Sequence, residues 1–300
     1  MMSTSFKVFV GIATTGRRAQ MGLTLAQLAR QTLQPDRIVV CPAADADFDP
    51  ADATRTTASL QIVQGERGSA SQRNAILRAC GEADLLLFID DDFYPADDYI
   101  ERLVQLFASH ADIVLATNQP DLDGATGPGV SHDAALAVLR QSALQQALAG
   151  PGTAVETYGG YGCNMTVRMA TVRQLDVWFD EALPLYGWLE DIDFSRRLAA
   201  GGGIVQCSAL HGVHLATKVG RTSGVRFGYS QVANPVYLMH KGSMSRRYGL
   251  RQMARNVAKN LLRVLWPEPW VDRRGRLKGN ALALLDMLRG QLHPGRVRAL

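Results

Sequence analysis

Short apolar segments alternate with helical patterns through the first 120 residues. Apolar runs typical of buried parallel strands cover residues 6–13, 38–41, 60–63, 84–89 and 113–116. Apolar residues at helical spacing fill residues 21–32, 71–80 and 99–107. This alternation predicts an α/β fold, with a mostly parallel sheet flanked by helices and joined by right-handed crossovers.

The second half of the chain has a more broken pattern. Residues 118–129 and 158–162 are rich in turn-forming residues and predict loops, and residues 188–200 predict a loop that runs into a helix. Three glycines, 201–203, end that helix before a last strand at 204–207. From about residue 243 the composition becomes helical and basic, which predicts a C-terminal helical extension.

Length, composition and cysteine spacing limit the class of protein that this chain can be. A length of 300 residues, 47% of them apolar, fits one large domain with an appendage. No run reaches the roughly 18–20 apolar residues of a membrane span, and the N-terminus lacks the pattern of a signal peptide. The cysteines are widely spaced and form no zinc or CxxC pattern, which favours a reduced cytoplasmic chain: Cys41, Cys80, Cys163 and Cys207.

Ligands of open α/β sheets bind outside the carboxyl ends of the strands. The fourth predicted strand ends in Phe88-Ile89 and runs into Asp90, Asp91 and Asp92. In an extended segment Asp90 and Asp92 point the same way, and two carboxylates on one side suit Mg²⁺ or Mn²⁺ bridging to phosphate. The alternative interpretation is an acidic turn that caps the next helix.

Two further segments can take part in chemistry. Glu190 and Asp191 stand where a loop enters a helix, so they either supply a general base or compensate the helix dipole. The segment from Gly68 to Asn74 follows the third strand. Its Arg73 either binds phosphate or pairs with the acidic triple, Asp90 to Asp92. The alternative is that Arg73 is a surface residue that follows a helix-capping serine.

The ordered set of these segments over residues 6–217 resembles the inverting family 2 glycosyltransferases of GT-A fold. The segments that carry the resemblance are Val8 to Arg17, Gly68 with Arg73-Asn74, Phe88 to Asp92, Gly162 to Met165, and Trp188 to Asp193. The resemblance implies a catalytic domain over 1–217, with the donor site in 1–117 and the acceptor side in 118–217. Residues 218–300 are then the basic extension.

The resemblance also implies roles for the matching residues. Asp90 and Asp92 match the DxD motif that holds a divalent metal against the donor diphosphate, and His214, or else His211, completes the metal shell. Asp191 matches the catalytic base, with Glu190 beside it. Donor binding falls to Thr14, Thr15, Arg17, Asp45, Arg73, Asp90, Asp91 and Asp92, and the sugar and acceptor side to Gly162, Asn164 and Trp188.

One departure concerns the donor base. Family members usually carry an Asp after the second strand that contacts the base, whereas this chain has Cys41 to Asp45, so Asp45, or Asp47, is the nearest acid. A UDP-, GDP- or dTDP-sugar therefore remains open as donor.

The basic extension carries two patterns. Asn234 to Leu238 with Lys241-Gly242 is similar to a segment of some bacterial polysaccharide-building members. Beyond it, basic residues recur every fourth position beside an apolar face with flanking tryptophans, which indicates either a helix lying on an anionic membrane or a core-packed helix with a solvated basic face. The basic residues are Arg247, Arg251, Arg255, Lys259 and Arg263, and the apolar ones Leu250, Met253, Val257, Leu261 and Leu265.

The hypothesis is a metal-dependent transferase that moves a sugar from a nucleotide donor to an acceptor hydroxyl with inversion, in polysaccharide or glycolipid assembly. The acceptor is a saccharide or a lipid-linked saccharide, and we expect no nucleic-acid partner. Two alternatives stay open: a sugar-phosphate nucleotidyltransferase, and a non-catalytic protein that binds nucleotide sugars.

Overall fold

The computed structural model describes residues 6–146, 152–219 and 222–300. These residues form two compact units. The sheet unit comprises Met1–Glu66, Gln72–Trp178 and Leu198–Gly220, and the helical unit comprises Arg67–Ser71, Phe179–Arg197 and Arg221–Leu300. The helical unit thus contains the segment around Asp191 in addition to the C-terminal extension.

An eight-stranded sheet is the centre of the sheet unit. Its strand order is β3 (Ser59–Ile62), β2 (Arg37–Pro42), β1 (Val8–Thr14), β4 (Leu85–Asp90), β9 (Asn164–Arg168), β6 (Ile113–Thr117), β10 (Gly203–Cys207) and β8 (Ala154–Glu156). β1 runs parallel to β2 and β4, β2 to β3, and β6 to β10, whereas β9 and β8 are antiparallel to their neighbours. The predicted mostly parallel sheet is confirmed.

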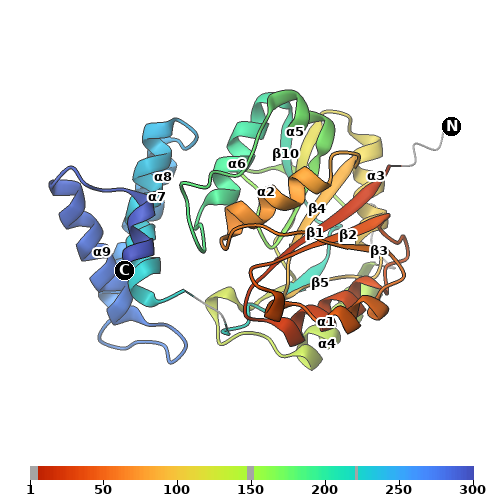
Figure 1. Ribbon diagram of the computed structural model, residues 1–300, viewed down its shortest axis with the longest axis horizontal. Helices are drawn as coiled ribbons and strands as arrows, with labels where there is room; N and C mark the ends of the chain where they lie inside the picture. The colour runs from red at the N-terminus through yellow and green to blue at the C-terminus, as the bar shows by residue number, and fades with distance from the viewer. Residues whose placement is uncertain (1–5, 147–151, 220–221) are drawn as a thin grey trace. The chain divides into compact units, whose positions relative to one another are not determined.

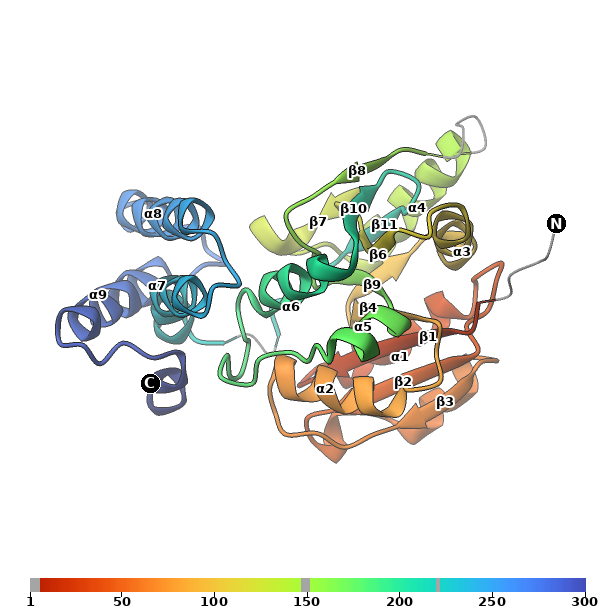
Figure 2. The same cartoon turned by 90° about the horizontal axis from the view of Figure 1, so that it is seen from above.

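Helices cover both faces of this sheet (Figures 1 and 2). Even-numbered residues of β1, such as Val10 and Ile12, share a core with α1 (Arg18–Leu28) and α3 (Tyr99–Ser109). On the opposite face Gly11 meets α2 (Ser69–Ala79) so closely that a Cβ there would lie 2.6 Å from Ile76. The alternating faces of β1 therefore explain why its apolar run is continuous. The remaining helices of this unit are α4 (His132–Gln146) and α5 (Met169–Leu175), with 3-10 turns at Asp45–Asp47, Pro50–Arg55 and Ala199–Gly201.

A small second sheet corrects two of the sequence predictions. It consists of β5 (Phe93–Pro95), β11 (Gly212–His214) and β7 (Leu122–Asp123). Residues 118–129 are therefore not only a loop, because they contain β7 and a 3-10 turn at Gly124–Thr126, and the strand at 203–207 is not the last. Strands of two or three residues whose partners lie about 90 to 120 positions away leave no local periodicity to detect.

The helical unit is built on α7 (Gly224–Lys241), α8 (Arg246–Arg263) and α9 (Arg273–Leu288), and it also contains most of α6 (Glu190–Leu198) and a 3-10 turn at Pro294–Ala299. α7 and α9 approach closely because of two glycines. A Cβ on Gly228 would lie 2.1 Å from the carbonyl oxygen of Arg276, and one on Gly279 would lie 2.1 Å from that of Val225. The three helices lie within the predicted C-terminal extension, residues 218–300, and α7 precedes residue 243, where the composition becomes helical and basic. Among the described helices, none combines the length and the hydropathy needed to cross a bilayer.

Candidate active site

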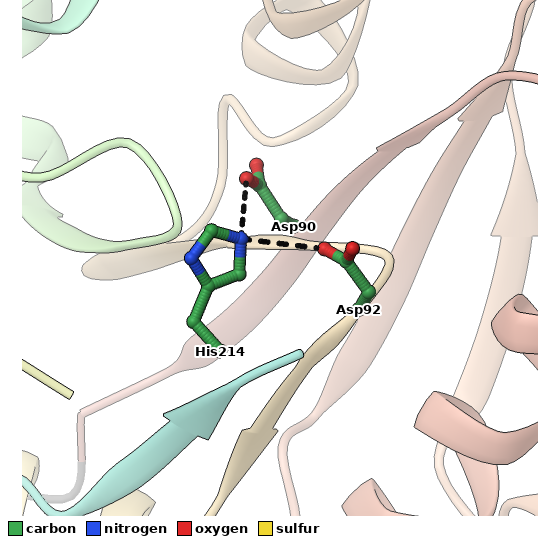
Figure 3. Close-up of side chains that lie close together, drawn as sticks. All are labelled: Asp90, Asp92 and His214. Atoms are coloured by element: carbon green, nitrogen blue, oxygen red, sulfur yellow. Dashed lines mark ion pairs between the residues drawn. The ribbon is translucent and has the colours of Figure 1, made fainter. Parts of the chain in front are cut away.

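Three side chains converge at the carboxyl end of β4 (Figure 3). Asp90 is the last residue of β4, and Asp92 follows in a turn at residues 91–92 that leads into β5. His214 ends β11, and the register that pairs His214 with Phe93 brings the imidazole to this turn. The segment is a turn rather than an extended strand, but the two carboxylates still face one site as the sequence predicted.

This group has the chemistry of a metal site. His214 Nε2 lies 3.8 Å from Asp90 Oδ2 and 3.5 Å from Asp92 Oδ1, and one ligand atom from each residue falls within 4.8 Å of the others. Asp92 Oδ1 is buried and has no hydrogen-bond partner among the described atoms, which is costly unless a cation binds it. Two carboxylates and an imidazole suit a divalent metal ion.

The other nitrogen of the His214 ring is held by a carboxylate. His214 Nδ1 lies 2.9 Å from Asp123 Oδ1, and the hydroxyl of Tyr161 donates to Asp123 Oδ2 at 2.8 Å. Burial lowers the pKa of His214, but the hydrogen bond to Asp123 and the nearby Asp92 carboxylate outweigh it and raise that pKa to about 10. The acidic surroundings thus favour a positive charge here, as they would favour a metal ion.

A second set of contacts orients the rest of the acidic triple. The backbone N–H and hydroxyl of Thr217 donate to Asp92 Oδ2 at 2.8 and 2.9 Å, and Arg17 lies 3.0 Å from the same oxygen. Asp91 turns away from the metal group to accept from Thr14 at 2.6 Å and Arg17 at 2.7 Å. Burial raises the pKa of Asp91 to about 7, whereas the nearby His214 and the Arg17 charge hold the pKa of Asp92 low despite its burial.

Arg73 connects the triple to the segment at Gly162. The residue is 5% exposed, and Nη2 lies 3.2 Å from Asp90 Oδ1 and 2.9 Å from the carbonyl oxygen of Gly162. The neighbouring Gln72 donates to the carbonyl oxygens of Thr14 and Cys41, which ties together the ends of β1 and β2. Arg73 is therefore buried beside Asp90 and is not the surface arginine of the alternative interpretation, and its contact with a donor diphosphate stays a prediction.

The remaining donor-side candidates are more exposed. Thr15 is half-buried in the turn after β1, and Asp45 is exposed in the turn after β2. Asp47, the second candidate for contact with the base, accepts the backbone N–H of Gly16 at 2.7 Å. Asp47 thus connects the two turns, and the predicted contact of Asp45 with the donor base stays a prediction.

Asn164 is buried at the start of β9 and is committed to the protein itself. Its Oδ1 accepts from Thr117 Oγ1 at 2.9 Å and from the N–H of Asn118 at 2.8 Å, and its Nδ2 donates to the Asn118 carbonyl oxygen at 3.0 Å. This bracing of β9 against β6 positions Gly162 nearby, and a direct contact of Asn164 with a sugar stays a prediction.

The acidic segment of α6 belongs to the helical unit and shows three different environments. Glu190 is buried and accepts the hydroxyl of Ser69 at 2.7 Å. Asp193 is fully buried and pairs with Arg197 at 2.7 Å. Asp191 is half-buried, with Oδ1 accepting the N–H of Ile192 at 2.8 Å, so it is the carboxylate of this helical turn with the most solvent access.

Trp188 precedes this turn and packs edge-on against Phe227, with ring centroids 5.9 Å apart. Its predicted role toward the acceptor stays a prediction.

Sequence reasoning missed Asp123, Tyr161 and Thr217, which hold His214 and Asp92. Asp123 and Tyr161 lie in segments that the sequence assigned to loops, and nothing local distinguished them from other polar loop residues. Between the two candidate histidines the structure favours His214, because His214 lies in the group with Asp90 and Asp92, whereas His211 lies outside it and bonds to Asp121 at 2.8 Å.

Comparisons with known proteins identify the family and the fold. The family model described as glycosyl transferase family 2 matches residues 9–172, and no curated protein matches the sequence. Among solved structures, a mannosyltransferase from Pyrobaculum calidifontis, in complex with GDP-Man and Mn²⁺, is similar at 16% identity and a TM-score of 0.56, over 99% of this chain and 86% of that one.

S. aureus TarS is a second similar structure. Residues 1–349 of TarS, in complex with UDP-GlcNAc, show 18% identity and a TM-score of 0.54, over 98% of this chain and 83% of that one. Against a longer TarS chain the identity is again 18%, the TM-score is 0.50, and the match covers 78% of this chain and 40% of that one. At such identities these likenesses show the GT-A fold alone. The family model, which spans more than half of the residues, shows that this chain belongs to glycosyl transferase family 2.

Proposed function

We propose that this glycosyltransferase is metal-dependent and inverting, and that it transfers a sugar from a nucleoside diphosphate to an acceptor hydroxyl. The observation that carries the proposal is the group of Asp90, Asp92 and His214 with its unpartnered, buried Asp92 oxygen. The neighbouring Arg17 and Arg73 supply fixed positive charges of the kind that bind diphosphate.

The ligand set fits a bound divalent metal. Asp90, Asp92 and His214 would hold it, and a metal so placed neutralises negative charge that develops on the departing diphosphate. The imidazole favours Mn²⁺ over Mg²⁺, because Mg²⁺ strongly prefers an all-oxygen shell. The P. calidifontis enzyme was solved with Mn²⁺, which supports the same choice.

The donor is a nucleotide sugar. The similar structures hold GDP-Man in one case and UDP-GlcNAc in the other, so they support this donor class without selecting a base. We therefore retain UDP-, GDP- and dTDP-sugars as candidates, with Thr14, Thr15, Arg17 and Asp45 or Asp47 on the nucleoside side.

We propose Asp191 as the general base and Glu190 as its support. The acceptor oxygen attacks the anomeric carbon, the bond from that carbon to the diphosphate oxygen breaks, and the acceptor proton passes to Asp191. One displacement inverts the configuration. The solvent access of Asp191 supports this assignment, because Glu190 and Asp193 are buried and engaged with Ser69 and Arg197.

The charge distribution supports an anionic surface as a further partner. Residues 221–300 contain sixteen Lys and Arg against three Asp and Glu, a net charge of +13 within a chain whose total is +4. The five stripe residues Arg247, Arg251, Arg255, Lys259 and Arg263 are all exposed on α8. Such a stripe is attracted to anionic lipid headgroups by about 1 kcal/mol per residue.

The apolar face of α8 is packed against the protein in one part and exposed to solvent in another. Met253 and Val257 pack against the core of the helical unit, which agrees with a core-packed helix. Towards the end of α8, however, Leu262, Leu265 and Trp266 are 71%, 72% and 74% exposed. Exposed leucine and tryptophan beside a basic stripe favour a membrane over a nucleic acid, so we propose peripheral attachment to an anionic membrane and a lipid-linked acceptor in polysaccharide or glycolipid assembly.

Incubation with labelled nucleotide sugars and Mn²⁺ tests the proposal against its alternatives. We expect transfer to an acceptor, or slow donor hydrolysis without one, and loss of both in EDTA. Release of pyrophosphate from a sugar phosphate and a nucleoside triphosphate would instead identify a nucleotidyltransferase, and binding without turnover would identify a non-catalytic protein.

A further inference from the structure

Helix α7 carries the segment from Asn234 to Gly242, to which the proposed function assigns no role. Three of its side chains, at positions 234, 237 and 241, contact residues 180–193, the stretch of chain that carries Glu190 and Asp191. Residues three, four and seven apart lie on one face of a helix, so one face of α7 supports this stretch.

Lys241 makes the central contact. Its Nζ lies 2.6 Å from Asp180 Oδ2 and 2.9 Å from Asp193 Oδ2, so one ammonium joins the start of the stretch to the helix α6. Tyr237 donates its hydroxyl to Asp180 Oδ2 at 2.9 Å. Gly242, at φ +85°, ends α7 directly after Lys241, a backbone conformation that glycine adopts without strain.

Asp193 makes this contact energetically important. Its side chain is fully buried, and Oδ2 receives both Lys241 and Arg197, while Oδ1 is buried with no hydrogen-bond partner among the described atoms. A buried carboxylate is costly unless it is well paired, so removal of Lys241 would leave this charge to Arg197 and would release the ion pair that holds α6 to α7.

The end of the loop before α6 is held by the same face of α7. Asn234 is 2% exposed, and its Nδ2 donates to the carbonyl oxygen of Trp188 at 2.7 Å. Leu189, the next residue, has φ +76°, a strained conformation for leucine that persists only where neighbours enforce it. The turn that presents Glu190 and Asp191 is thus fixed from α7 on both sides.

We propose that Lys241, assisted by Tyr237 and Asn234, is a positioning residue for the general base. Asp191 and Asp193 are two residues apart on α6, about 200° around the helix, so pinning Asp193 towards α7 turns Asp191 to the other side. Helix α7 would then support the general base, whereas the attachment surface is proposed for α8. The inference rests on the proposed role of Asp191.

A double-mutant cycle of Lys241→Met and Asp191→Asn tests the inference with a water-soluble acceptor. We expect Lys241→Met to lower kcat at least tenfold, with the donor KM and the Mn²⁺ affinity within twofold of wild type, and Lys241→Arg to restore part of the loss. If Lys241 acts through Asp191, the double variant is no slower than Asp191→Asn alone. Lys278→Met, which removes an exposed lysine of α9, is the matched control and should leave kcat unchanged.

The outcomes separate the two hypotheses. Full activity of Asp191→Asn would overturn the proposed base itself. An inactive Asp191→Asn combined with a normal Lys241→Met, or with effects that multiply in the double variant, would overturn the positioning role alone. If circular dichroism shows that Lys241→Met is unfolded, Tyr237→Phe, which removes one hydroxyl, replaces it in the cycle with an expected loss of about threefold to tenfold and the same criteria.

Discussion

Replacing Asp123 by Asn should weaken metal binding without touching a proposed ligand. Asp123 Oδ1 holds His214 Nδ1 at 2.9 Å, which fixes the ring so that Nε2 faces Asp90 and Asp92. A carboxylate behind a metal-binding histidine also raises the basicity of the imidazole, and its loss typically weakens metal affinity about 10–100-fold. That range corresponds to about 1.4–2.8 kcal/mol of binding free energy.

The chain offers a matched control two residues away. Asp121 holds His211 Nδ1 at 2.8 Å in the same pair of segments, but neither residue belongs to the metal group. Asp121→Asn therefore removes an equivalent carboxylate–histidine contact and should leave metal affinity unchanged. Tyr161→Phe, which removes the hydroxyl that donates to Asp123 Oδ2 at 2.8 Å, should have an effect of less than about tenfold.

Calorimetric titration with Mn²⁺ measures these affinities directly, and activity against Mn²⁺ concentration provides an independent readout. We expect the Asp123→Asn curve to move to higher Mn²⁺ with most of kcat recovered at saturation. Equal Mn²⁺ affinities for Asp123→Asn and Asp121→Asn would refute the reasoning, because His214 would then bind no metal or need no orientation.

Three further outcomes are expected. Asp90→Ala and Asp92→Ala should each abolish transfer and weaken donor binding in the presence of Mn²⁺, and full activity of either variant in a transfer assay would contradict the metal site. Asp191→Asn should keep donor affinity but lower kcat by orders of magnitude, because a base acts mainly on the transition state. Unchanged turnover in a correctly folded variant would place the base elsewhere, and Glu190 and Asp193 would be the next candidates. Wild type should sediment with anionic vesicles at low salt and not at high salt. A variant with Arg247, Arg251, Arg255 and Lys259 changed to Gln should stay in solution. Equal sedimentation of both proteins would exclude α8 from membrane attachment.

The amino-acid sequence by itself was sufficient for the features that depend on local pattern. Continuous apolar runs mark β1, β2 and β4 because strands buried on both faces need apolar residues at every position. Ligands of such sheets bind at the strand ends, and this rule singles out Asp90 and Asp92 from their position in the chain. Helical spacing likewise identifies α8 and its basic stripe, since the period of a helix is written in consecutive residues.

Only the tertiary structure decided which distant residues share these sites. Asp123 and His214 are 91 positions apart, and their contact depends on the pairing of β7 with β11, two strands too short to show a period. The division of the α8 face and the contact of Lys241 with Asp193 also depend on how helices pack. Patterns along a chain report which face of an element is apolar, but the identity of the partner that covers it depends on the free energy of the whole fold.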